Sequence, residues 1–270
     1  MIAITIELRE LKEKRLATPC RSSLNIGDRV LVATDNGLEE GRVIEPEKVV
    51  DKEIEIKIVR RLNENDMRVL KENKEKAREV LPEIRREIEK EKLQMDLTYI
   101  TYTYDRQKLY IYYTAEARVD FRKLIRVLGS RFKTRIQMVQ IGVRDEASIV
   151  GGLGLCGREI CCKGFLRKIE SVNIDLARIQ YSSINPENVT GCCGRLLCCV
   201  RYESEFYQEK HKKFPKVGKK VNTPEGRGEI IEVNYIKGTI SIKLKTGAVR
   251  KLTYEELSSG VKDKFKKWIK

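Results

Sequence analysis

The sequence is poor in histidine and contains no long apolar run. Its single histidine, His211, stands in the basic run Lys210–Lys213, so no Cys–His–Asp catalytic group can be built on it and we expect it on the solvated surface. No segment approaches the ~20 consecutive apolar residues that a membrane-spanning helix needs. The stretch Met1–Arg15 carries charges from Glu7 onward, where a signal peptide needs an apolar centre. We therefore predict a cytoplasmic protein, and the lack of a recognisable catalytic constellation predicts that it is not an enzyme.

Length and charge set the next limits. The 270 residues are enough for two or three domains, and 41% hydrophobic residues with 35% charged residues exclude wholesale disorder. The formal net charge is +15, and residues 201–270 alone hold 18 Lys and Arg against 9 Asp and Glu. Such a field attracts polyanions, which makes RNA a predicted partner of the C-terminal segment. The alternative is a solvated lysine-rich surface, because aromatic residues are thinly interleaved there.

Periodicity predicts three domains, which we place at residues 1–60, 61–205 and 206–270. The strand Ile2–Leu8, with its alternating apolar residues, and the turn residues typical of hairpins that follow it predict an N-terminal β-unit. The turn at Pro224–Gly226 and the strands around it predict a second, basic β-unit at the C-terminus.

The central domain is expected to be an α+β layer. A long helix is predicted over Asn63–Leu93, interrupted or kinked near Pro82. Two tyrosine-rich strands, Thr98–Tyr104 and Lys108–Thr114, should form a hairpin, followed by an amphipathic helix over 121–132 and a strand at Arg135–Val143. The predicted fold class is therefore α+β: a central α/β sandwich with helices on one face of its sheet and a cysteine-rich insertion, flanked by small β-barrel-like units.

The cysteine-rich insertion contains two copies of a C-G-R-x-x-C-C motif. Three cysteines of the first copy recur in the second after the same interval of 37 residues. These six candidate ligands are Cys156, Cys161, Cys162, Cys193, Cys198 and Cys199. Thiols are kept reduced in the cytosol, so clustered cysteines there usually bind metal or perform chemistry. Cys20 is isolated and is expected to pack rather than to ligate.

Thiolates are soft anions that bind zinc or iron, and the repeat predicts two half-sites of one kind. Gly157 and Gly194 allow positive φ or a close approach of the backbone, while Arg158 and Arg195 can offset thiolate charge. A C-x4-C spacing suits an iron–sulfur cluster and is allowed for zinc, so both metals stay open, with an iron–sulfur cluster preferred. Buried packing cysteines, disulfides and a vicinal thiol-redox pair are the remaining alternatives.

Several segments together resemble one known family. They are Gly142–Ala147, Gly151–Gly154, both C-G-R-x-x-C-C elements, Ser183–Pro186 and Arg201–Glu203. This combination is similar to the bacterial RicT (YaaT) family, which is built on the polymerase-suppressor C-terminal domain. Cys192 departs from the family pattern, because it stands where an apolar residue is usual.

The resemblance implies a cytoplasmic regulatory subunit that joins two small helical partners of the RicA and RicF type in a complex carrying [4Fe–4S] clusters. It also implies that the complex tunes messenger-RNA processing by RNase Y, and through it sporulation, competence and biofilm formation. The six repeated cysteines fall on the family's cysteine positions and are the implied cluster ligands. The competing hypotheses are an RNA-binding module with structural zinc and a thiol-redox protein.

Overall fold

The computed structural model describes residues 1–8, 13–20, 22–51, 53–166, 168–181, 184–223 and 225–257. Ser183 of the resemblance motifs, Pro224 of the predicted turn and residues 258–270 of the predicted C-terminal domain lie outside the described residues. The chain divides into two compact units. The first unit comprises Met1–Leu153 and Gly157–Arg167, and the second comprises Gly154–Cys156 and Lys168–Lys270.

The N-terminal β-unit of the first unit is a closed five-stranded barrel in the order β1-β2-β5-β3-β4. Its strands are β1 (Ile2–Leu8), β2 (Glu13–Thr18), β3 (Arg29–Thr34), β4 (Gly37–Val49) and β5 (Ile56–Arg61). The β2–β5 pair is parallel and the other pairs are antiparallel. Alternating apolar side chains fill the interior, as the sequence predicted, and Cys20 packs against this core.

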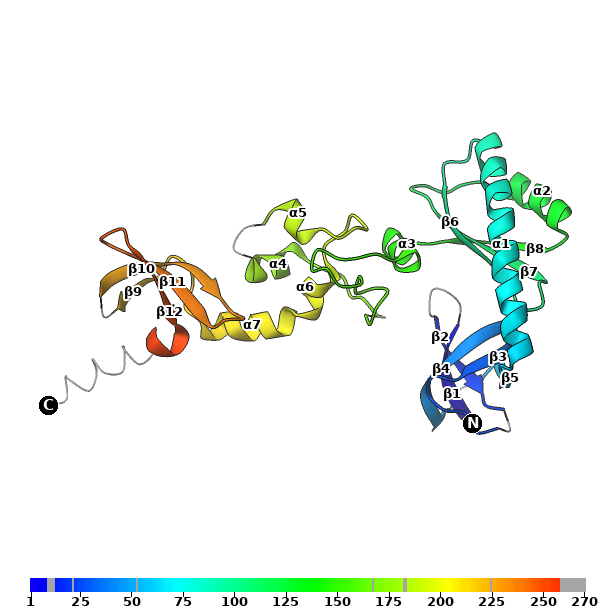
Figure 1. Ribbon diagram of the computed structural model, residues 1–270, viewed down its shortest axis with the longest axis horizontal. Coiled ribbons are helices and arrows are strands. Elements are labelled where there is room, and N and C mark those ends of the chain that lie inside the picture. The colour runs from blue at the N-terminus through cyan, green and yellow to red at the C-terminus, as the bar shows by residue number, and fades with distance from the viewer. Residues whose placement is uncertain are drawn as a thin grey trace. The chain divides into compact units, whose positions relative to one another are not determined.

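Helix α1 (Glu64–Lys90) extends from the barrel to the central sheet as one continuous helix (Figure 1). Asn63 and Asp66 form a capping box at its start, which satisfies backbone N–H groups that have no partner within the helix. The helix continues through Pro82, whereas the sequence suggested an interruption or kink there. Val80 and Ile84 on either side of the proline are buried in the core, and this packing offsets the hydrogen bond that proline cannot make.

The central sheet has the order β6-β7-β8. Strands β6 (Asp96–Tyr102) and β7 (Lys108–Thr114) form the predicted hairpin, and β8 (Arg135–Gln140) pairs parallel with β7. Helix α2 (Arg122–Phe132) provides the crossover that a parallel pair requires.

Both faces of this sheet are covered. Helices α1 and α2 share one core cluster with Leu109 and Ile111 of β7. Tyr110 and Tyr112 point to the opposite face, where Ile149 of α3 (Val143–Val150) packs near them. The prediction of helices on one face is thus wrong for α3. The predicted strand Arg135–Val143 also ends early, because the chain leaves the sheet at Gln140 and starts α3 at Val143.

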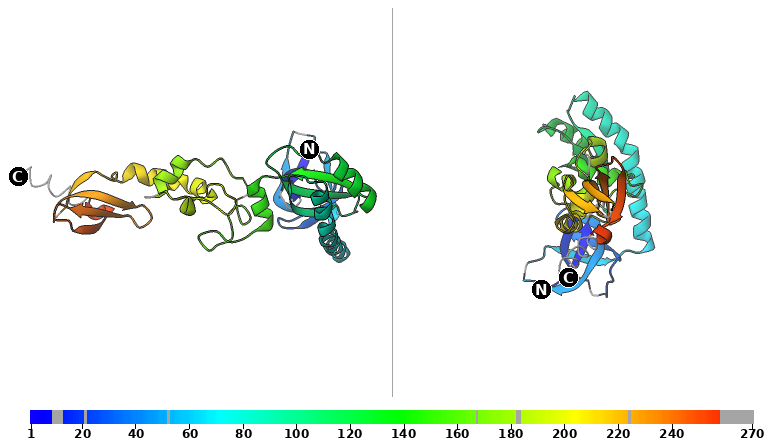
Figure 2. Two further views of the ribbon diagram at one scale, coloured as in Figure 1. Left: turned by 90° about the horizontal axis from the view of Figure 1, so that it is seen from above. Right: turned by 90° about the vertical axis from the view of Figure 1, so that its left-hand side faces the viewer.

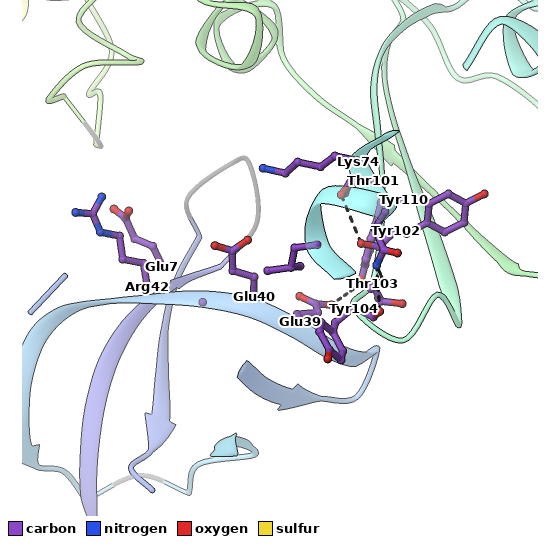
Figure 3. Close-up of a pocket in the computed structure, with 13 residues that line it drawn as sticks. Glu7, Glu39, Glu40, Arg42, Lys74, Thr101, Tyr102, Thr103, Tyr104 and Tyr110 are labelled. Atoms are coloured by element: carbon purple, nitrogen blue, oxygen red, sulfur yellow. Dashed lines mark hydrogen bonds between the residues drawn. The ribbon is translucent and has the colours of Figure 1, made fainter. Parts of the chain in front are cut away.

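The barrel and the central sheet are joined by a polar junction. The Tyr110 hydroxyl donates to Glu39 Oε1 at 2.8 Å, and both side chains are buried. The Tyr104 N–H donates to the Leu38 carbonyl at 2.7 Å. A cavity of about 260 Å³ lies beside these contacts, lined by residues of the barrel, α1, β6 and β7 (Figure 3). Its polar side chains include acidic, basic and tyrosine residues.

In the described part of the second unit, four helices precede the C-terminal sheet. They are α4 (Ile174–Gln180), α5 (Pro186–Val189), α6 (Cys198–Tyr202) and α7 (Ser204–Lys213). A small cluster of Ala177, Val189 and Val200 holds α4, α5 and α6 together.

The rest of the second unit is an antiparallel sheet of order β12-β11-β10-β9, reached through α7 (Figure 2). Its strands are β9 (Lys220–Thr223), β10 (Gly226–Asn234), β11 (Thr239–Leu244) and β12 (Val249–Thr253). The sequence predicted a barrel-like unit, but within residues 220–257, apart from Pro224, no strand pairing joins β9 to β12. In the part of the chain that the structure describes, no helix is both long and apolar enough to span a bilayer.

Candidate metal centre: two repeated cysteine loops

The two C-G-R-x-x-C-C motifs fold into loops of the same form. An isolated antiparallel bridge joins Leu153 to Glu159 in the first cysteine loop (residues 153–162). The corresponding bridge joins Thr190 to Leu196 in the second cysteine loop (residues 190–199). Each bridge residue of the second loop lies 37 positions after its counterpart, the same interval that relates the cysteines.

The hydrogen bonds around the loops repeat as well. The Ile160 N–H donates to the Gly152 carbonyl at 3.1 Å, and the Leu197 N–H donates to the Val189 carbonyl at 2.9 Å. The Lys163 N–H donates to the Ile160 carbonyl at 3.0 Å, and the Val200 N–H donates to the Leu197 carbonyl at 3.2 Å. The sequence repeat is therefore a structural repeat of the backbone.

The glycine after the first cysteine sets the shape of each loop. Gly157 has φ of 74° and Gly194 has φ of 71°, a left-handed conformation that L side chains rarely adopt. A Cβ atom at either position would meet nothing within 4 Å, so the backbone conformation rather than crowding requires glycine. Of the two roles that the sequence allowed for these glycines, positive φ and a close backbone approach, the structure shows positive φ.

The first loop is held by α3. The Ser148 hydroxyl donates to the Cys162 carbonyl at 3.0 Å, and the Lys163 ammonium donates to the Ile149 carbonyl at 3.1 Å. Ile160, between the cysteines, is buried. These contacts fix the backbone of the vicinal cysteine pair of this motif against the first unit.

The second loop is held by the helices around it. The Gln180 amide at the end of α4 donates to the Val200 carbonyl at 2.6 Å, and Val200 is fully buried. Arg201 pairs with Glu170, with its Nε 2.9 Å from Oε2. Cys198 is the first residue of α6, so this vicinal pair sits at the start of a short helix.

Cys199 lies close to two tyrosines of the second unit. Burial is the main cause that raises the pKa of the Tyr181 hydroxyl, and negative charge at Cys199 and Glu203 raises it further. Burial also raises the pKa of Tyr207, with added contributions from Glu203 and Cys199. Because their pKa values are raised, both tyrosine hydroxyls stay neutral beside Cys199, and Cys199 and Glu203 are the groups whose negative charge acts on them.

The loop cysteines differ in exposure. Cys156 is exposed, and Cys193 and both vicinal pairs are half-buried. Cys192 is exposed and occupies the position that Leu155 holds in the first loop, where Leu155 is 68% exposed. Cys192 therefore lies at a loop surface; the sequence left open whether it competes for metal or only fills space.

The predicted ligands are divided between the two units. Cys161 and Cys162 belong to the first unit, while Cys156, Cys193, Cys198 and Cys199 belong to the second. Among the described residues, no three Cys, His, Asp or Glu side chains form a group that could hold a metal ion. The thiols are chemically suited to iron or zinc, and the exposed Arg158 and Arg195 can offset thiolate charge. In the part of the chain that it describes, the structure thus supplies the repeated loops and the thiol donors.

Comparison with known proteins adds the family. The model of the PSP1 C-terminal conserved region matches residues 56–141, and that of the PSP1-like protein third domain matches residues 171–214. The stage 0 sporulation protein YaaT of Bacillus subtilis is 37% identical over 233 residues, covering 84% of this chain and 85% of YaaT. The chain belongs to the YaaT family. An uncharacterized protein of Schizosaccharomyces pombe is 39% identical over 61 residues, covering 23% of this chain and 8% of that protein. No solved structure matches the chain.

In this YaaT-family chain, only one of the two cysteine loops lies inside a segment that a family model matches. The third-domain match contains the second loop, while the first loop lies between the two matched segments. The conserved-region match covers β5 to β8 with α1 and α2, which form the central layer.

Sequence reasoning missed the junction around Glu39 and Tyr110, because these residues are 71 positions apart and carry no local motif.

Proposed function

We propose that this chain is a non-enzymatic regulatory subunit of a complex that carries [4Fe–4S] clusters. The proposal includes partners of the RicA and RicF type and modulation of RNase Y-dependent messenger-RNA processing in sporulation, competence and biofilm formation. Its main support is the pair of cysteine loops with corresponding bridges, two corresponding hydrogen bonds each and the same left-handed glycine. The match to a protein named for stage 0 sporulation supports the biological role.

The cluster ligands in this proposal come from the repeated cysteines. They are Cys156, Cys161, Cys162, Cys193, Cys198 and Cys199. A bound cluster would neutralise thiolate charge and make the protein sensitive to oxygen and electron supply. The chain's own contribution is to hold thiols on rigid loops and to place Arg158 and Arg195 beside them in sequence, where guanidinium charge favours thiolates.

Exposed apolar side chains near the loops support a role as a subunit. Leu153 is 72% exposed and Leu155 is 68% exposed, although both are large apolar residues. Phe165 after the first loop and Tyr202 after the second lie 37 positions apart and are 57% and 60% exposed. Large apolar and aromatic side chains with high exposed fractions are typical of protein–protein contact sites.

The cluster is tested by anaerobic purification and reconstitution with iron and sulfide. We expect a brown protein with bound iron and acid-labile sulfide, and less of both in Cys161→Ser and Cys198→Ser. Cys20→Ser is the matched control, because Cys20 packs against the barrel core outside the motifs. A colourless protein holding stoichiometric zinc under the same conditions would reject the iron–sulfur proposal in favour of structural zinc.

The subunit role is tested by co-purification with the RicA-type and RicF-type partners. Leu155→Ser and Phe165→Ser should reduce recovery of the partners while leaving the melting temperature unchanged. Ile236→Ser is the control, since Ile236 is 73% exposed but lies in the turn after β10. Equal recovery with all three variants would argue against a role of the loop surface in assembly.

A further inference from the structure

The C-terminal sheet of the second unit has one apolar face and one basic face. Ile230, Ile240 and Ile242 are at most 1% exposed and form its core with Phe214. Glu229 adjoins Ile230 in β10 and is exposed, so it points to the opposite face, as alternation along a strand requires. The strand register therefore identifies which side chains share the solvent face.

The register places cations around Glu229. Glu229 pairs with Lys220 of β9 on one side and with Lys243 of β11 on the other. Arg227 lies two residues before Glu229 on the same face, and the Lys245 N–H donates to the Arg227 carbonyl at 3.2 Å. These side chains line a hollow of about 650 Å³, in which Glu229 is the one lining carboxylate among the described residues.

The cations in this hollow are available to a ligand. Lys220, Arg227, Lys243 and Lys245 are exposed. Among the described residues, none of these four cations has a carboxylate oxygen within 4.0 Å. Four cations around a single carboxylate lower the energy of a bound polyanion, because binding releases its condensed counterions.

The shape of the face selects the part of the polyanion that it contacts. Neighbouring strands lie about 4.8 Å apart and successive side chains on one face about 7 Å apart, so the cations form a grid of fixed spacing. The described residues that line the hollow include no aromatic side chain on which a base could stack. A face of this kind contacts phosphates and makes no base contacts that would depend on sequence.

We propose that the basic face formed by Lys220, Arg227, Lys243 and Lys245 binds the phosphate backbone of single-stranded RNA without sequence preference. The choice of RNA among nucleic acids rests on the proposed function, which places the chain beside messenger RNA. The binding face itself follows from the register and charge of the sheet, and it does not depend on a cluster.

The test is fluorescence anisotropy of a labelled single-stranded RNA with the full chain. In the face variant, Lys220, Arg227, Lys243 and Lys245 are all replaced by Gln. The control variant replaces Lys71, Lys74, Lys76 and Arg78 of α1 by Gln, which removes the same charge from exposed helix positions. We expect the face variant to weaken binding at least tenfold at low salt and the control variant to change it less than threefold.

Salt dependence gives a second readout. If the four cations contact phosphates, the slope of log affinity against log salt should fall in magnitude by about 3 in the face variant. Glu229→Gln should tighten binding, because it removes the carboxylate from the centre of the face. Equal losses in both quadruple variants, or an unchanged slope, would overturn the proposal, as would binding of polyglutamate with no binding of RNA.

The outcome can be separated from that of the cluster proposal. Cys161→Ser and Cys198→Ser should bind RNA like the unmodified chain, and the face variant should retain its iron and sulfide. Homopolymers of uridine and adenosine should bind within threefold of each other. A preference of more than tenfold for one of them would contradict a phosphate-only contact.

Discussion

Gly157 and Gly194 adopt the same left-handed backbone, with φ of 74° and 71°, at corresponding positions of the two cysteine loops. Replacing either glycine by Ala should strain its loop by about 1–2 kcal/mol, because Cβ clashes with the backbone in this region. We expect Gly157→Ala and Gly194→Ala to reduce iron content after reconstitution. Asn at the same positions should retain more iron, since Asn tolerates the left-handed conformation.

Gly129 provides the control for these glycine variants. It lies inside α2, and a Cβ atom there would meet only the Thr134 carbonyl, at 3.9 Å. Gly129→Ala should raise the free energy of unfolding by up to about 1 kcal/mol, because alanine favours helix more than glycine does. Loss of iron in Gly129→Ala equal to that in Gly157→Ala would show that the loop conformation is not the cause.

Cys192→Leu should leave the iron content of the reconstituted protein unchanged. Cys192 is exposed at the position that Leu155 occupies in the first loop, so leucine restores the residue type of the other copy. Cys193→Ser, one residue later, should lower iron content. Iron analysis of the two variants side by side checks this, and a loss in Cys192→Leu would make Cys192 a ligand.

Asp66 should make the first unit sensitive to acid. The Arg60 guanidinium, with help from the Asn63 N–H and the Tyr104 hydroxyl, holds the pKa of the Asp66 carboxyl well below its usual range. The folded state therefore binds this proton less readily than the unfolded state, whose pKa is about 3.9. The stabilisation is fully present above pH values near 4–5 and is lost as the pH falls toward the folded pKa.

Asp66→Asn should lower the free energy of unfolding by about 1.5–3 kcal/mol at neutral pH, and this difference from the unmodified protein should shrink on acidification. Urea unfolding between pH 3 and 7 measures it. Asp120→Asn is the control, because the Asp120–Arg122 pair is exposed and solvent screens it. A pH-independent deficit in Asp66→Asn would contradict the role of the carboxylate charge.

Tyr110→Phe should weaken the junction between the barrel and the central sheet. The substitution removes a hydrogen bond of 2.8 Å to Glu39, whose side chain is 4% exposed. Hydrogen bonds to charged groups contribute about 1.5–3 kcal/mol, so we expect a loss of that size in chemical denaturation. Tyr202→Phe changes a tyrosine that is 60% exposed and should have almost no effect.

Local patterns predicted the elements of the first unit well. The structure confirms the hairpin of Thr98–Tyr104 and Lys108–Thr114 and the helix that ends at Phe132. The side chains of the hairpin follow the two-residue period of a strand, and those of the helix follow the 3.6-residue period of a helix. Pro82 misled the helix prediction, since local propensity ignores the buried side chains that hold α1 on both sides of it. The strand predicted to reach Val143 ends at Gln140, and α3 covers the second face of the sheet.

For the cysteine loops too, the sequence predicted local features but not contacts between distant residues. The interval of 37 residues predicted two equivalent half-sites, and the bridges and glycine conformations show that the two loops share one backbone form. The sequence could not assign Cys161 and Cys162 to one compact unit and Cys198 and Cys199 to the other, because spacing along a chain does not specify which contacts form through space.

The sequence by itself determined the repeated cysteine motifs, the glycines at corresponding positions in them and the excess of positive charge toward the C-terminus, because each follows from neighbouring residues. Only the tertiary structure decided that β2 pairs in parallel with β5, that Glu39 meets Tyr110, and that Lys220 and Lys243 flank Glu229 on one face. Those relationships depend on strand register and packing between distant segments. The register and the packing are those that bury the apolar side chains of the whole fold, so no local stretch of the chain is enough to specify them.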